Sequence, residues 1–255
     1  AKAAMDTGVA RITVDLDQYR DRLQKLLSRS YQVMATVFAK ARQKTSRIVF
    51  NDGEHPRVQQ AARILREEGV CEPVLLGPRA EIERTLIERN LDEDLKGVLI
   101  LDPLTSEKTL QYADAYWHRR QRHGVNRDSA QVRMRGRGYF ASMIVEVGDA
   151  DVMVTGLTQS YPEAIRPPLE VIRTRSGRHA GGVYLVVTRS DFKFFTDCTV
   201  NPDPDPEHLA EMAVATAELA RTFDVTPRVA FLSYSNFGSA GGPSVAKVRK
   251  AVELA

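Results

Sequence analysis

The chain has 255 residues, of which 43% are hydrophobic and 27% charged, and this balance favours a globular chain over a disordered one. Its 36 basic and 33 acidic residues give a net charge of +3, which argues against a nucleic-acid-binding surface over the whole molecule. Two distant cysteines support neither a disulfide framework nor a cysteine-rich metal site, and no apolar run is long enough to span a membrane, so we expect a cytoplasmic protein with no nucleic-acid or membrane partner.

Residues 1–46 predict a linker that precedes the main fold. From Asp15 to about Gln43, apolar residues such as Leu16, Tyr19 and Leu23 recur at steps of three and four, which is the pattern of an amphipathic helix. The chain also opens without an initiator methionine. We therefore expect a linker helix, and we expect the chain to be a piece of a larger protein.

Residues 47–190 predict a first subdomain in which strands alternate with helices. Short apolar runs are bounded by turn signals such as Asn51-Asp52-Gly53, and helical patterns lie between them. This alternation is typical of an α/β fold with a mostly parallel sheet and helices on both faces. Strands are expected at 47–50, 73–76, 97–101, 151–155 and 183–188, and helices at about 58–69, 81–89, 107–122 and 139–147.

A proline-rich segment, TDCTVNPDPDPEHLAEM, predicts a second subdomain at 191–255, separated from the first by a cleft. Asp205 is expected to cap a helix that has Pro206 at its first position and runs to Phe223. A strand is expected at 228–234 and a closing helix at 245–254.

The loop SNFGSAGGPS is the strongest local signal for ligand binding. Small residues between a strand and a helix let backbone N–H groups approach an anion, and a helix N-terminus favours negative charge. The alternative is a connector whose glycines serve only the turn, because neither a Walker lysine nor a GxGxxG pattern is present. The candidate phosphate contacts here are Ser233, Ser235, Asn236, Gly238 and Ser239.

A second candidate loop follows the strand expected at 151–155. Thr158 and Gln159 offer a hydroxyl and an amide at the end of this strand, and Arg166 and further arginines follow. Such groups can hold a phosphate or a carbonyl. The alternative is a capped helix start with solvated arginines, which the residues alone favour.

The arginine-rich tract from Trp117 to Arg137 is a third candidate, for nucleic acid or for a nucleotide-like ligand. The balanced total charge favours a solvated helix face instead. The five histidines show no metal-ligand spacing, and a GxSxG elbow is absent, so no metal site and no catalytic residue is assigned.

Several ordered blocks resemble the phosphate acetyltransferase family. RIVFNDGEHPRVQQAARILREEGVCEPVLLG is similar to its opening strand, helix and strand, and GYFASMIVEVGDADVMVTGLTQSYPEAIRPPLEVI to its central block. DCTVNPDPDPEHLAEMAVATAE is similar to its entry into the second domain, and FLSYSNFGSA to its serine-rich loop. The resemblance covers most of the chain from Arg47 to Ala255.

The opening phrase AAMDTGVAR, followed by a linker helix, resembles the end of the catalytic part of hybrid NADP-dependent malic enzymes, in which a malic enzyme is fused to a transacetylase-like domain. The resemblance implies a parent that converts malate to pyruvate with NADP and a divalent metal, Mg or Mn, in its catalytic domain. It implies that the present residues form a regulatory domain that senses acetyl-CoA as an effector. The alternative is an active phosphate acetyltransferase that moves acetyl between acetyl phosphate and coenzyme A.

The resemblance also implies what this chain does itself. The aspartate thought to deprotonate coenzyme A belongs to a stretch beyond Ala255, so no acetyl transfer is expected. Acetyl-CoA is expected in the cleft, between the 233–239 loop and the group Thr158, Gln159 and Arg166. A homodimer or higher homo-oligomer is expected through the helices at 209–223 and from Val245, because their apolar surface exceeds what a short lobe covers itself.

Overall fold

The computed structural model describes residues 1–10, 12, 14–20, 29–188 and 191–255. It divides into two compact units, which we describe separately. The sheet unit comprises Phe38–Arg175, and the hairpin unit comprises Ala1–Val37 with Ser176–Ala255. The chain passes from one unit to the other between Val37 and Phe38 and again between Arg175 and Ser176.

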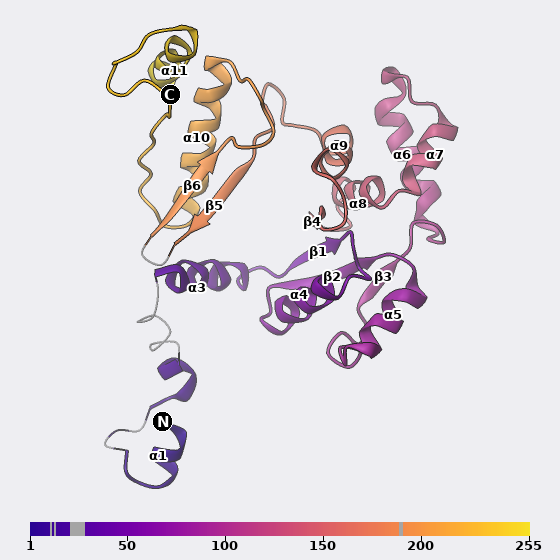
Figure 1. Ribbon diagram of the computed structural model, residues 1–255. Helices are drawn as coiled ribbons and strands as arrows, with labels where there is room; N and C mark the ends of the chain where they lie inside the picture. Colours follow the sequence, from indigo (N-terminus) through magenta and orange to yellow (C-terminus); the bar gives the residue numbers. More distant parts are fainter. Residues whose placement is uncertain (11, 13, 21–28, 189–190) are drawn as a thin grey trace. The chain divides into compact units, whose positions relative to one another are not determined.

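A four-stranded parallel sheet forms the centre of the sheet unit (Figure 1). Its strands are β1 (Ser46–Phe50), β2 (Cys71–Leu76), β3 (Leu99–Leu101) and β4 (Val152–Val154), in the order β3-β2-β1-β4. In the register of the sheet, Val49 pairs with Val74 on one side and with Met153 on the other. The predicted parallel α/β fold is confirmed.

Helices cover both faces of this sheet. Successive side chains of a strand point to opposite faces, so neighbouring residues pack against different helices. Val49 belongs to a core cluster with Tyr116 and Phe140, and its neighbour Phe50 belongs to a second cluster with Ala62 and Ile82. The helices of the first cluster are α6 (Lys108–Arg120), α7 (Arg127–Met134) and α8 (Arg137–Glu146), and those of the second are α4 (Pro56–Glu67) and α5 (Arg79–Glu88). A further helix, α9 (Tyr161–Val171), follows β4 and packs on α8.

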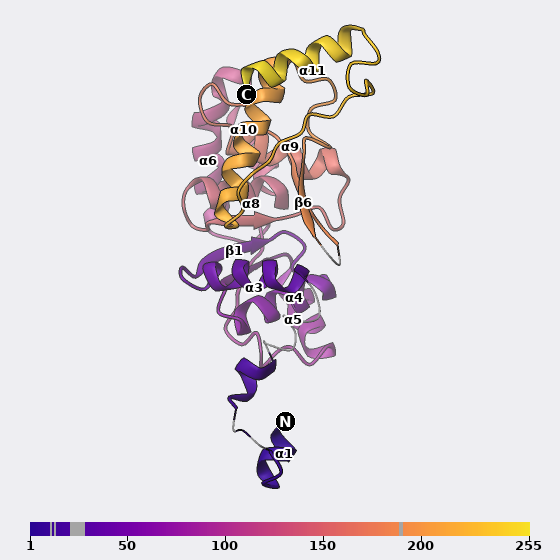
Figure 2. The ribbon, with the colours of Figure 1, turned by 90° about the vertical axis from the view of Figure 1, so that its left-hand side faces the viewer.

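The hairpin unit contains a two-stranded antiparallel sheet, β5 (Val183–Val187) and β6 (Phe192–Thr196), in which Leu185 pairs with Phe194. Phe194 also packs edge-on against Phe223, at the end of α10 (Pro206–Thr222). The last helix, α11 (Pro243–Leu254), packs across the N-terminal end of α10, as the two views in Figures 1 and 2 show. The expected capping of α10 is confirmed, since the Asp205 carboxylate accepts a hydrogen bond of 2.7 Å from the His208 N–H.

Three described stretches of the N-terminal region are helical. These are α1 (Lys2–Asp6), residues 16–20, and α3 (Arg29–Ala41). The middle of the expected linker helix, residues 21–28, lies outside the described residues. In the part of the chain that the structure describes, no helix is both long and apolar enough to cross a membrane.

Two expected strands need correction. The strand at 183–188 does not extend the parallel sheet, because it pairs antiparallel with β6, a strand that the sequence did not predict. The strand at 228–234 is wrong: these residues have no regular structure, and Val229 and Leu232 are 55% and 79% exposed. An apolar run forms a strand only where another strand pairs with it.

Candidate functional site

The first polar group of the sheet unit lies where β1 ends. The β1 loop begins with Asn51 and Asp52, and both residues are almost fully buried, at 0% and 3% exposure. Chain order reverses across β1, because β2 and β3 lie on one side of it and β4 on the other. In open α/β sheets, ligands bind at the carboxyl ends of strands beside such a reversal.

Gly53 lets the β1 loop run close to β2. A Cβ atom at this position would lie 2.7 Å from the Leu76 carbonyl oxygen and 2.9 Å from the Leu75 side chain. The Gly53 N–H donates to that same Leu76 carbonyl at 2.9 Å. The loop is therefore fixed in place by backbone contacts that a larger residue would disrupt.

The β4 loop, Thr155–Ser160, closes over the β1 loop through side-chain hydrogen bonds. The Asn51 amide donates to the Thr155 hydroxyl at 3.2 Å, and the Thr155 hydroxyl lies 3.5 Å from the Gln159 side-chain oxygen. The Thr158 hydroxyl donates to the Asp52 carboxylate. The predicted residues Thr158 and Gln159 thus belong to one polar group with Asn51 and Asp52.

Two acceptors in this group have no partner. The Asn51 side-chain oxygen and Glu54 Oε2 are buried and accept no hydrogen bond among the described residues. Glu54 Oε1, by contrast, accepts from Arg137 at the start of α8, at 2.6 Å. A buried acceptor without a donor is costly, and both oxygens keep the capacity to accept a hydrogen bond.

Helix α9 begins directly after the β4 loop, and its start is capped. The Ser160 backbone N–H and hydroxyl both donate to Glu163, at 3.0 and 2.7 Å. Both hydrogen bonds lower the pKa of the Glu163 carboxyl, and the one from the Ser160 side chain has the larger effect. The capped helix start that the residues alone favoured is therefore present.

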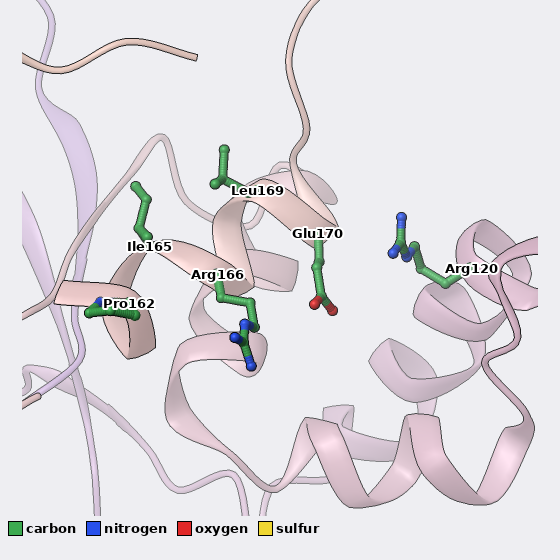
Figure 3. A pocket seen from close by; sticks show the side chains of 6 residues that line it. All are labelled: Arg120, Pro162, Ile165, Arg166, Leu169 and Glu170. Carbon is green, nitrogen blue, oxygen red and sulfur yellow. The ribbon is translucent and has the colours of Figure 1, made fainter. Parts of the chain in front are cut away.

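Arg166, on α9, lines a shallow pocket of about 350 Å³ (Figure 3). Arg166 and Glu170 extend from the same side of α9, and Arg120 approaches from the end of α6. The Nε atom of Arg120 is buried without a hydrogen-bond partner among the described residues. The pocket is lined by Arg120, Pro162, Ile165, Arg166, Leu169 and Glu170.

The acid in this pocket is already engaged. Glu170 Oε2 accepts from Arg133 at 2.6 Å, from Tyr139 at 2.9 Å and from Tyr116 at 3.1 Å. Burial, followed by the hydrogen bond to Glu170, raises the pKa of Tyr139 to about 12, so this phenol stays a donor at neutral pH. The two arginines of the pocket, Arg120 and Arg166, have no ion pair with a carboxylate among the described residues, and the pocket can therefore attract an anion.

The serine-rich loop of the hairpin unit folds onto itself. The Ser235 hydroxyl donates to the Ala240 carbonyl at 2.9 Å, and the Ser239 hydroxyl accepts from the Asn236 N–H at 3.1 Å. Gly238 has a φ of +81°, which a glycine adopts without strain. The Ser233 hydroxyl accepts from the Ser235 N–H at 3.1 Å, so several groups expected to contact a phosphate are used within the loop.

Within the sheet unit, the structure brings some of the predicted site residues together. Thr158 and Gln159 share one polar group, and Arg166 lies further along the same connection, on α9. The 233–239 loop belongs to the other unit, so the shared cleft stays a prediction.

Two components of the site were not predicted from the sequence. Asn51 and Asp52 have the residue types of a turn, although polar residues directly after a buried strand could also indicate a site. Arg120 lies in an arginine-rich tract for which the sequence predicts a solvated helix face, although most of that tract is structural. Arg119, Arg127, Arg133 and Arg137 pair with Glu146, Asp114, Glu170 and Glu54, respectively.

Comparisons with known proteins agree on one family. The profile described as "Phosphate acetyl/butaryl transferase" matches residues 32–255. A phosphotransacetylase from Streptococcus pyogenes has a similar structure, with a TM-score of 0.79, 35% identity, and coverage of 86% of this chain and 68% of that one. The EutD phosphotransacetylase from Staphylococcus aureus gives 0.78 at 32% identity, over 88% of this chain and 67% of that one.

Curated relatives are of two kinds. A phosphate acetyltransferase from Synechocystis is 37% identical over 209 residues, which is 82% of this chain and 30% of that protein. An NADP-dependent malic enzyme from Salmonella typhimurium is 35% identical over 259 residues, which is 99% of this chain and 34% of that protein. The chain thus spans about a third of the length of the relatives that it matches first.

Proposed function

Since the chain belongs to the phosphate acetyl/butaryl transferase family, we propose that it is a regulatory acetyl-CoA-binding domain of an NADP-dependent malic enzyme. The observation that carries this proposal is the extent of the matches. Malic enzymes from Salmonella typhimurium and Escherichia coli match 99% and 100% of this chain, including the residues before 32 that the family profile leaves out. The phosphate acetyltransferases from Synechocystis and Clostridium acetobutylicum match 82% and 87%.

The site offers complementary groups for such a ligand. Acetyl-CoA carries a diphosphate and a ribose phosphate, and guanidinium groups without a carboxylate partner bind phosphate well. Arg120 and Arg166 provide this chemistry in one pocket. The buried acceptors Asn51 Oδ1 and Glu54 Oε2 suit the amide or hydroxyl donors of the ligand's neutral part.

The proposed parent reaction lies outside these residues. The parent would oxidatively decarboxylate malate to pyruvate and CO2 with NADP and Mg or Mn, and acetyl-CoA binding would shift the balance between its states. Among the described residues, no group of three His, Cys, Asp or Glu side chains is placed to hold a metal ion. The metal and NADP are therefore proposed for the malic-enzyme part of the same chain, and the assembly for a homodimer or higher homo-oligomer.

An active phosphate acetyltransferase is the second candidate. It is supported by the family profile and by the two phosphotransacetylase structures, which match 86% and 88% of this chain. The two candidates differ in turnover: the acetyltransferase forms acetyl-CoA from acetyl phosphate and coenzyme A, and the regulatory domain only binds the thioester.

Calorimetry with acetyl-CoA, together with a thioester-forming assay, tests the proposal. Loss of a charge-assisted contact costs about 1.5–3 kcal/mol, so Arg166→Ala and Arg120→Ala should each weaken binding about tenfold or more. The matched control is Arg89→Ala, because Arg89 is an exposed arginine at the end of α5, away from the pocket lining. Binding without thioester formation is expected. Thioester formation would favour the acetyltransferase, and equal binding by all three variants would contradict the pocket assignment.

A further inference from the structure

Glu170 is an unexpected lining residue for a pocket proposed to bind an anion, because its carboxylate is itself negatively charged. It lies one helical turn after Arg166, on the same side of α9 (Figure 3). At this i, i+4 spacing, an arginine and a glutamate ordinarily pair. Here they do not, because Glu170 is held by residues of three other helices.

Arg133 supplies the positive charge in that group. Its Nη1 atom lies 2.6 Å from Glu170 Oε2 and 2.6 Å from the Tyr116 hydroxyl. Its guanidinium also lies 5.5 and 5.9 Å from the ring centres of Tyr139 and Tyr116. The Arg133 and Glu170 side chains are only 37% and 24% exposed, so water screens their attraction less than at an open surface. Arg133 itself does not line the pocket.

We propose that Arg133 is a positioning residue that keeps this pocket selective for phosphate: by binding Glu170, it leaves Arg120 and Arg166 available to a phosphate or diphosphate group. Without Arg133, the Glu170 carboxylate would face the two pocket arginines, pair with them, and compete with the ligand. The inference rests on the proposed function only in taking acetyl-CoA as the natural source of the phosphate groups.

Inorganic pyrophosphate and acetyl-CoA, titrated by calorimetry into the full chain, test this. Arg133→Met should weaken pyrophosphate binding about tenfold, which is the scale of one charge-assisted contact. The double variant Arg133→Met/Glu170→Gln should restore binding to within about twofold of wild type, because the competing charge is gone. A residue that only supports the fold would show no such rescue.

Two further variants complete the design. Glu170→Gln alone should bind pyrophosphate at least as well as wild type. This variant tests the proposal even if Arg133→Met fails to fold. Arg127→Met is the matched control, since Arg127 also lies on α7 and pairs with an acid, Asp114, outside the pocket lining. Its pyrophosphate affinity should not change.

The outcomes separate the two proposals. Pyrophosphate binding that depends on Arg166 and is rescued as described, without acetyl-CoA binding, would refute the proposed function and support the role of Arg133. The role of Arg133 is overturned if wild type binds no pyrophosphate, if a folded Arg133→Met binds it normally, if the double variant stays as weak as the single one, or if Glu170→Gln loses about tenfold or more.

Discussion

The two units of the chain bury different kinds of side chain. Phe140, Tyr116 and Leu75 of the sheet unit are fully buried, and both large core clusters lie in that unit. Among the described residues of the hairpin unit, the best buried apolar one is Ala251, and Phe237 in the same unit is fully exposed. Because hydrophobic stabilisation grows with the apolar area buried, the sheet unit should hold most of the folding free energy.

A cavity in the sheet unit is the strongest test of this difference. Phe140→Ala removes a ring that packs edge-on against Tyr112 at 5.1 Å, so it should cost about 3–5 kcal/mol of the free energy of unfolding. Phe237→Ala, in the hairpin unit, should change it by less than about 0.5 kcal/mol. Urea unfolding followed by the fluorescence of Trp117, the chain's one tryptophan, reports on the sheet unit.

Far-UV circular dichroism provides the second probe for the same pair of variants, because α10 and α11 contribute to it. If Phe237→Ala destabilised the protein as much as Phe140→Ala, the hairpin unit would have to bury this ring, and the proposed difference between the units would be wrong.

Two glycines sharpen the comparison at the level of the backbone. Gly53→Ala would place a Cβ atom 2.7 Å from the Leu76 carbonyl, so the β1 loop or β2 must move, at a cost of about 1–3 kcal/mol. Gly241 in the hairpin unit has open space around its Cα atom, and Gly241→Ala should be close to neutral. Thermal unfolding of both variants checks this, and an equal shift of Tm would contradict it.

The sequence predicted the fold of the sheet unit better than that of the hairpin unit, and the reason is physical. At Val49 and Phe50 the apolar pattern is sufficient, because every strand there has a partner and both faces are covered. At 228–234 the same kind of pattern failed, because strand formation depends on pairing that the segment itself does not specify. The strand β6 was not predicted for the same reason, because it forms by pairing with β5.

The candidate site was predictable only in part for a similar reason. Thr158 and Gln159 follow a strand, and their residue types indicated a polar loop. The role of Arg120 depends on which arginines of its tract meet an acid, and those partners, such as Glu146 and Glu170, are distant in sequence. Composition indicates a basic tract, but only the tertiary structure shows which charges remain unpaired.

The cap of α10 tests a local contact in the hairpin unit. Asp205→Ala removes the acceptor of the His208 N–H and should destabilise the helix by about 1 kcal/mol. Asp203→Ala is the matched control. The Asp203 carboxylate pairs with Lys247 but is exposed to solvent, so this ion pair should contribute little to stability. Hydrogen exchange of the α10 amides should therefore quicken in the first variant only. Equal protection in both would show that packing, and not the cap, holds the start of α10.

The smallest change in the free energy of unfolding is expected at Asp149, a partly exposed residue of the sheet unit. The Asp149 carboxylate accepts from Lys108 Nζ at 2.6 Å and from the buried Tyr112 hydroxyl. The hydrogen bond from Lys108, followed by that from Tyr112, lowers the pKa of Asp149 below its ordinary value of 3.8. Since the Asp149 side chain is 40% exposed, solvent screens the pair, and Asp149→Asn should cost less than about 1 kcal/mol.

The pH dependence of that loss identifies its origin. A carboxyl whose pKa is lower in the folded state stabilises the fold fully above the unfolded pKa of 3.8, and this contribution disappears as the pH falls through the folded pKa. The difference in unfolding free energy between wild type and Asp149→Asn should therefore be constant near neutral pH and shrink below pH 3.8. Added salt should also reduce it. Asp92→Asn, at an exposed turn, is the control and should match wild type throughout. A difference that persisted unchanged at low pH would mean that Asp149 acts through its shape and not through its charge.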